Sequence, residues 1–158
     1  MSSHHLKARL KELGVEQLPT PAAPAANYVP YVVSGNMLYI SGQLPVKDGA
    51  VVKGILGKDT SIEQGQEAAK LCALSILAQA NAALAGQLER IVQCTKLGVF
   101  VTSTPEFTDQ PKVANGASDF LVGALGNAGK HARFAVGVAA LPFGAAVEVD
   151  AVFELSAA

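Results

Sequence analysis

Apolar residues recur every three or four positions in two long segments of the chain, residues 62–85 and 111–125. Cys72 and Ile76 belong to the apolar stripe of the first segment, and Phe120 belongs to that of the second. A repeat of this length places apolar side chains on one face of an α-helix. The pattern therefore predicts two helices that each bury one face.

Local signals mark the ends of both predicted helices. Thr60 stands three residues before Glu63, which is the spacing of a capping box at a helix N-terminus. Gly86 follows the first segment and suits the position just beyond a helix C-terminus. Pro111 suits the first position of the second helix, because its missing N–H has no partner there.

Strands are predicted where β-branched residues cluster or where apolar and polar residues alternate. These segments are residues 29–33, 37–43, 51–52, 91–101, 134–141 and 147–155. Pro30 makes the first of them an edge strand or a strand start. Lys47-Asp48-Gly49 is a hairpin signal. The run 134–141 has the composition of a buried strand, whereas 147–155 alternates strictly.

The order of these elements predicts an α+β fold with one mixed sheet and two helices on one face. The pattern of residues 1–26 is different and predicts a short amphipathic helix that ends at Gly14, followed by a linker that contains three prolines. They are too short to hold a core of their own. We therefore predict an N-terminal appendage over residues 1–26 and a domain over residues 27–158.

Charged residues make up 16% of the 158 residues, which is below the usual quarter. Oligomerisation would hide part of such a surface, and a chain that is merely rich in Ala and Gly is the alternative. The net charge of −1 and the lack of a basic run argue against nucleic-acid partners. No secretory signal or membrane-spanning run is evident, and Cys72 and Cys94 form no disulfide framework. These features predict a cytoplasmic protein.

Arg133 begins an otherwise apolar strand segment. A strand-end arginine that reaches solvent is one interpretation. The other is an anion anchor, because a guanidinium holds a carboxylate with two parallel hydrogen bonds that lysine cannot copy.

Glu148 and Asp150 share the polar face of the last strand, either on a solvated sheet face or as buried carboxylates near the arginine. If the last two strands formed a hairpin, Arg133 and Glu148 would lie near its opposite ends. A joint site would then need another strand pairing or a neighbouring subunit.

Other candidates are polar residues or glycines near strand and helix ends. Ser41 and Gly42 stand at a strand end, where glycine can expose backbone N–H groups or mark a bulge. Asn115 lies within the second helix, and its simpler interpretation is that it is an exposed polar residue of that helix. Tyr28 could pack or donate its hydroxyl. The three histidines have no metal-binding spacing.

Two motifs resemble those of the YjgF/RidA family, also described as endoribonuclease L-PSP-like. Residues 35–45, GNMLYISGQLP, resemble its first signature, and the string from Arg133 to Val149 resembles its closing motif. The resemblance runs from about Tyr28 to Leu155.

The resemblance implies a chorismate-mutase-like fold and a homotrimer with a central barrel, whose ligand sites lie between subunits. It further implies hydrolysis of enamine or imine intermediates such as 2-aminoacrylate to 2-keto acids and ammonia, without metal or cofactor. This is the activity of a 2-iminobutanoate/2-iminopropanoate deaminase.

By the same resemblance, Arg133 clamps the substrate carboxylate and Glu148 orients the attacking water. The residues that line the cleft are Tyr28, Ser41, Gly42 and Asn115. The chain departs from the family where the GPYSQA tract is absent and where Phe134 and Ala135 follow the arginine in place of the usual Ser and Cys. The alternatives are a noncatalytic trimer that binds small carboxylates, as a sensor or chaperone, and an endoribonuclease.

Overall fold

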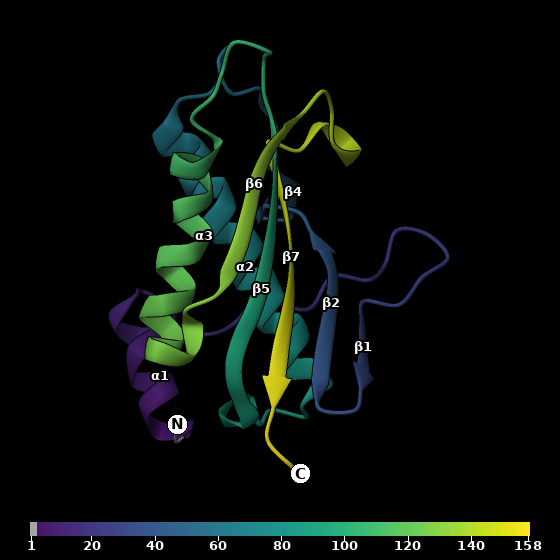
Figure 1. The fold of residues 1–158 in the computed structure, drawn as a ribbon, viewed down its shortest axis with the longest axis vertical. Helices are drawn as coiled ribbons and strands as arrows, with labels where there is room; N and C mark the ends of the chain where they lie inside the picture. Colours follow the sequence, from purple (N-terminus) through teal and green to yellow (C-terminus); the bar gives the residue numbers. More distant parts are fainter. Residues whose placement is uncertain (1–2) are drawn as a thin grey trace.

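The computed structural model describes residues 3–158 and places five strands in one mixed sheet, in the order β1–β2–β7–β5–β6 (Figure 1). These strands are β1 (Tyr31–Ser34), β2 (Met37–Gln43), β5 (Ile91–Thr102), β6 (Ala132–Val138) and β7 (Val147–Leu155). β5 and β6 are parallel, and the other neighbours are antiparallel. The short strands β3 (Val46–Lys47) and β4 (Ala50–Val51) form the predicted hairpin. The α+β class with a mixed sheet is confirmed.

Three α-helices accompany the sheet. α2 (Ile62–Ala83) and α3 (Gln110–Leu125) cover one face, and α1 (Ser3–Glu12) packs on α3 (Figure 1). Short 3₁₀ turns are η1 (Leu88–Arg90), η2 (Gly126–Gly129) and η3 (Pro142–Gly144). Within residues 3–158, no helix lies over the opposite face of the sheet.

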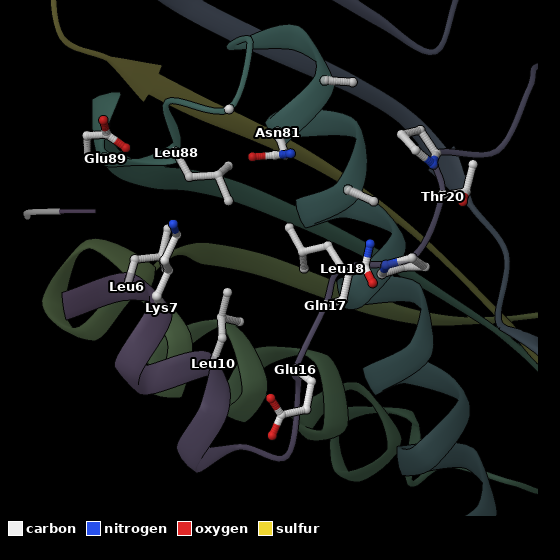
Figure 2. A pocket seen from close by; sticks show the side chains of 15 residues that line it. Leu6, Lys7, Leu10, Glu16, Gln17, Leu18, Thr20, Asn81, Leu88 and Glu89 are labelled. Carbon is white, nitrogen blue, oxygen red and sulfur yellow. The ribbon is translucent and has the colours of Figure 1, made fainter. Parts of the chain in front are cut away.

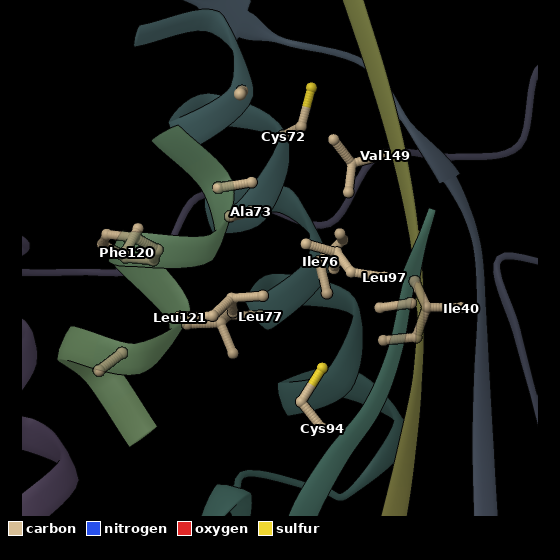
Figure 3. Packing of buried hydrophobic residues seen from close by; sticks show 14 of the residues in the cluster. Ile40, Cys72, Ala73, Ile76, Leu77, Cys94, Leu97, Phe120, Leu121 and Val149 are labelled. Atoms are coloured by element: carbon tan, nitrogen blue, oxygen red, sulfur yellow. The ribbon is translucent and has the colours of Figure 1, made fainter. Parts of the chain in front are cut away.

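The core lies between the two long helices and the sheet. Ile76 and Leu77 of α2 meet Leu97 of β5 and Val149 of β7, and all four are fully buried (Figure 3). β7 alternates buried and half-buried residues along its whole length, as its sequence predicts. Cys72 and Cys94 are free and buried, and burial raises the pKa of Cys94 to about 12.

The N-terminus of α2 begins one residue later than the capping-box prediction. The Ser61 hydroxyl accepts from Gln64 N at 3.1 Å, and Gln64 Oε1 accepts from Ser61 N at 2.8 Å. Thr60 is not the cap, because its hydroxyl donates to Asp59 Oδ1 at 2.8 Å. Ser61 offers the same side-chain chemistry, so the sequence pattern could not separate the two registers.

β6 is not the buried strand that its composition suggests. It pairs only with β5 and forms an edge of the sheet, and 37% of Phe134 and 43% of Val136 are exposed. The last two strands do not form a hairpin either, because β5 lies between β6 and β7. β6 pairs in parallel with β5, and α3 crosses over between these two strands. This pairing joins residues far apart in the chain, so the local sequence does not predict it.

The N-terminal helix contributes two leucines to the core, since Leu6 and Leu10 are only 4% and 7% exposed. We expect Leu10→Ala to lower the free energy of unfolding by about 2 kcal/mol, through lost burial and the cavity left behind. Chemical denaturation would measure it, with Lys11→Ala on the exposed face of the same helix as control. Equal stability of the two variants would show that α1 does not hold its place in solution.

Candidate functional site

Arg133 lies near the start of β6 and faces α3. It stands opposite Leu97, whose side chain is fully buried beneath the helices, so the two side chains share the helix-covered face. Its Nη1 donates to Asn115 Oδ1 at 2.9 Å and to Ser118 Oγ at 3.0 Å. Its Nη2 donates to the carbonyl of Pro111 at 3.3 Å. α3 therefore holds the guanidinium in one orientation.

Three of the five N–H donors of Arg133 are used in this way. The N–H of Nε and one N–H of Nη2 make no hydrogen bond within residues 3–158, and no carboxylate in that range forms an ion pair with the guanidinium. The side chain is half-buried. A fixed, half-buried cation with unused donors is suited to binding an anion from outside the chain.

Sequence reasoning missed two residues beside this anchor, Ser118 and His131. Ser118 Oγ lies 2.8 Å from His131 Nε2, and His131 Nδ1 lies 2.6 Å from the carbonyl oxygen of Gly129. Ser118 follows Asn115 by three residues on α3, and His131 precedes Arg133 by two. Both intervals keep side chains on one face, and this was the signal that could have found them.

The other predicted residues form a second group, away from Arg133. Ser41 donates its hydroxyl to the carbonyl of Val29 at 2.7 Å and so ties the segment that contains Tyr28 to β2. The β2–β7 register shifts between Ile40 and Gln43, so the bulge expected near Gly42 is present. Tyr28 and Gly42 line a small cavity of about 150 Å³.

Glu148 belongs to this second group, because its carboxylate lies against Gly42. A Cβ added to Gly42 would come within 2.7 Å of Glu148 Oε2, so glycine is what lets the carboxylate sit there. Burial, and secondarily the nearby charge of Asp150, raise the pKa of Glu148. A half-buried carboxylate with a raised pKa is suited to exchanging a proton or orienting a water.

Within one chain, Arg133 and Glu148 cannot contact the same small molecule. Arg133 is level with Leu97 on β5, whereas Glu148 is level with Phe100. The two are therefore displaced by about 10 Å along β5 and by about 10 Å across two strand spacings. They also lie on opposite faces, because Phe100 and Glu148 point away from the helices. The buried carboxylate beside the arginine, one of the two sequence interpretations, is wrong for a single chain.

The helix-free face around Glu148 combines aromatic rings with two carboxylates. Phe100 and Phe134 meet edge to face with ring centroids 5.2 Å apart, and a Cβ on Gly98 would come within 2.7 Å of the Phe134 ring. Burial raises the pKa of Asp150, and a hydrogen bond from the Gly98 backbone partly offsets it. Ionised Asp150 and Glu148 therefore both oppose folding on this face.

We expect Asp150→Asn to stabilise the protein increasingly as pH rises above about 4. An acid whose pKa is raised in the folded state adds most to the stability of the fold below its unfolded pKa, about 3.9. This stabilisation is lost as pH rises through the folded-state pKa. Urea unfolding at several pH values would measure the difference from the wild type. Asp48→Asn, at an exposed hairpin turn, removes the same charge as control. A difference that shrinks toward neutral pH would contradict the assignment.

A separate cavity of about 440 Å³ lies between α1, the segment 16–21, the end of α2 and η1 (Figure 2). Leu6, Leu10, Leu18 and Leu88 surround it, with Asn81 beside them (Figure 2). None of the predicted site residues lines it. Within residues 3–158, no cluster of three or more His, Cys, Asp or Glu is placed to hold a metal ion. No helix in that range is both long enough and apolar enough to cross a bilayer.

Comparison with known proteins decides the family. A family model described as YjgF/chorismate mutase-like, with a proposed endoribonuclease activity, matches residues 7–155. The chain belongs to the YjgF/RidA family. Protein TCP17 of Trypanosoma cruzi is 52% identical over 158 residues, covering 99% of this chain and 98% of that protein. The sequence resemblance is thereby confirmed.

Solved structures agree with this family assignment. The Atu1372 protein of Agrobacterium tumefaciens, whose function is unknown, is 50% identical with a TM-score of 0.91, covering 98% of this chain and 94% of that one. RidA from the Antarctic bacterium Psychrobacter is 29% identical with a TM-score of 0.60, covering 88% and 96%. This YjgF/RidA chain thus shares its fold with proteins from across the family.

Proposed function

We propose that this YjgF/RidA protein is a hydrolase that converts reactive 2-imino and 2-enamino acids, such as 2-aminoacrylate, to 2-keto acids and ammonia. The observation that carries the proposal is the guanidinium of Arg133, held by α3 with unused donors and no carboxylate partner within residues 3–158. A carboxylate is the planar anion that fits two neighbouring N–H groups. The similarity of the chain to RidA from Psychrobacter, at 29% identity, supports this proposal.

We further propose that the site is completed by a second copy of the chain in a homotrimer. Arg133 and Glu148 lie too far apart, on opposite faces, to act together within one subunit. The helix-free face carries Phe100, Phe134 and half-buried carboxylates that oligomerisation would cover. Packing three sheets by this face would place β6, the edge strand that carries Arg133, beside a neighbouring subunit. We propose that the Tyr28, Gly42 and Glu148 group of that neighbour completes the Arg133 site.

The chemistry needs only positioning and proton transfer. Arg133 binds the substrate carboxylate, and Glu148 orients a water and accepts its proton as the oxygen attacks the imine carbon. Attack on the protonated imine gives a neutral carbinolamine. Glu148 then returns its proton to the nitrogen, the C–N bond breaks to release ammonia, and the hydroxyl proton passes back to Glu148 as the C=O bond of the keto acid forms. Because burial raises the pKa of Glu148, its protonated form is more accessible than that of a glutamate in water. An enamine substrate first takes a proton on carbon to become the imine.

An assay with 2-aminoacrylate tests the activity. A serine dehydratase generates the intermediate, and the rate of pyruvate release is followed with and without this protein. We expect faster release with the protein present and a loss of that effect in Glu148→Gln. Identical rates with and without protein would overturn the hydrolase assignment. Binding of 2-oxobutanoate retained in that case would identify a noncatalytic carboxylate-binding protein.

The oligomeric state is tested independently by light scattering during size-exclusion chromatography. We expect three times the 16.2 kDa chain mass. A monomer at micromolar concentration would remove the proposed intersubunit site, whatever the outcome of the assay. A cytoplasmic location stays a prediction and would follow from localisation of a tagged chain.

A further inference from the structure

A chain of hydrogen bonds supports the Arg133 anchor from behind and ends on the backbone. His131 Nδ1 lies 2.6 Å from Gly129 O, and His131 Nε2 lies 2.8 Å from Ser118 Oγ. Ser118 Oγ in turn accepts from Arg133 Nη1 at 3.0 Å. The three side chains come from α3, from the residue just before β6 and from β6 itself, so the arrangement depends on how α3 packs beside that strand.

The direction of every hydrogen in this chain follows from one end. A carbonyl oxygen can only accept, so the hydrogen between Gly129 and His131 belongs to Nδ1. In the neutral imidazole, Nε2 is then an acceptor, and the Ser118 hydroxyl must donate to it. Ser118 thereby turns a lone pair toward Arg133 and has no hydrogen left for any other partner.

The acceptors of the cluster are thus directed at the guanidinium. Asn115 Oδ1, Ser118 Oγ and Pro111 O each accept from Arg133. The groups that remain for a ligand are donors: the N–H of Nε, one N–H of Nη2 and the amide N–H groups of Asn115. Such a cluster fits an ionised carboxylate, which only accepts, and mismatches a carboxamide, whose NH₂ would need an acceptor.

We propose that Ser118 and His131 are positioning residues that make the Arg133 site selective for an ionised carboxylate over the corresponding carboxamide. The inference rests on the proposed function, because it concerns the same anchor. Without the Nε2 acceptor, the Ser118 hydroxyl is free to rotate. Its oxygen and hydrogen then become available to a ligand, and Arg133 loses a fixed partner.

Calorimetry with two probes tests the proposal, 2-oxobutanoate and its amide, 2-oxobutanamide. The measured quantity is the ratio of their dissociation constants. We expect His131→Leu to lower the preference for the acid about 3- to 10-fold, the effect of about one net hydrogen bond. His131→Gln offers an amide oxygen to the Ser118 hydroxyl and is expected to restore much of the preference.

A double-mutant cycle shows whether His131 acts through Ser118. If it does, Ser118→Ala combined with His131→Leu gives the same ratio as Ser118→Ala alone. Fully additive effects, or a ratio unchanged in His131→Leu while Arg133→Ala still abolishes binding, would overturn this inference and leave the proposed function intact. Absence of any 2-oxobutanoate binding by the wild type would overturn both.

The tautomer of His131 provides a readout that does not depend on a variant folding. Nitrogen chemical shifts of the imidazole in the wild-type protein distinguish a hydrogen on Nδ1 from one on Nε2. We expect the Nδ1–H form at neutral pH. The Nε2–H form would reverse the hydroxyl of Ser118 and overturn the inference.

Discussion

Arg133→Ala is expected to weaken binding of 2-oxobutanoate about 100-fold or more and to abolish accelerated hydrolysis of 2-aminoacrylate. The variant removes both unused donors of the anchor, and a hydrogen bond to a charged group is worth about 1.5–3 kcal/mol. Each tenfold change in affinity corresponds to about 1.4 kcal/mol, so the loss of two such bonds weakens binding by about 100-fold or more. Calorimetry and the pyruvate-release assay measure the two effects separately.

Two further variants separate geometry from charge at this position. Arg133→Lys keeps a positive charge but cannot present two parallel N–H groups, so we expect most of the affinity to be lost. Lys112→Ala removes an exposed cation of α3 whose Nζ lies 3.7 Å from Asp109 Oδ1, and this variant is expected to bind normally. If Arg133→Lys bound as tightly as the wild type, the anchor would act as a simple point charge. The proposed pair of parallel hydrogen bonds from Arg133 to the carboxylate would then be wrong.

Gly116→Ala is expected to lower the free energy of unfolding by about 3 kcal/mol, near the upper end for overpacking. A Cβ at Gly116 would overlap the backbone carbonyl of Gln66, so α2 and α3 cross closely at this point. Backbone atoms cannot move aside as a flexible side chain can, and the two helices would have to separate. The hydrogen bond from Gln66 Nε2 to Lys112 O, 2.9 Å long, spans the same crossing and would be strained.

Gly123→Ala is the matched control on the same helix. The three atoms nearest to a Cβ there are side-chain atoms of Leu13, at 3.2 Å or more, and the position is exposed. Alanine favours helix over glycine by about 1 kcal/mol, so we expect this variant to be as stable as the wild type or slightly more stable. Urea denaturation of both would decide. Equal stabilities of Gly116→Ala and Gly123→Ala would show that α2 and α3 do not approach so closely in solution.

Much of the secondary structure could be read from local pattern. The strict alternation of residues 147–155 predicted the bounds of β7, and the stripe through Cys72 and Ile76 predicted which face of α2 is buried. Pro111 lies in the first turn of α3, as its missing N–H requires. These features depend on periodicity and on single-residue backbone preferences, which act over a few neighbouring positions.

Part of the candidate site could be predicted from the sequence, and part could not. Motif resemblance identified Arg133, Glu148 and Gly42 by position, and the roles assigned to them stay predictions. Composition did not reveal that β6 is an edge strand, because an edge and a centre can carry the same apolar residues. It also did not reveal that Ser118 and His131 support the guanidinium.

The sequence by itself determined the family resemblance, most of the helices and strands, and the buried faces of α2, α3 and β7, because motifs, hydrophobic period and turn chemistry are local properties. Only the tertiary structure decided that β5 separates β6 from β7, and so placed Arg133 and Glu148 on opposite faces about 10 Å apart along β5. Strand order depends on contacts between residues far apart in the chain. No local window contains that information, and it is what separates the Arg133 group from the Glu148 group within one chain.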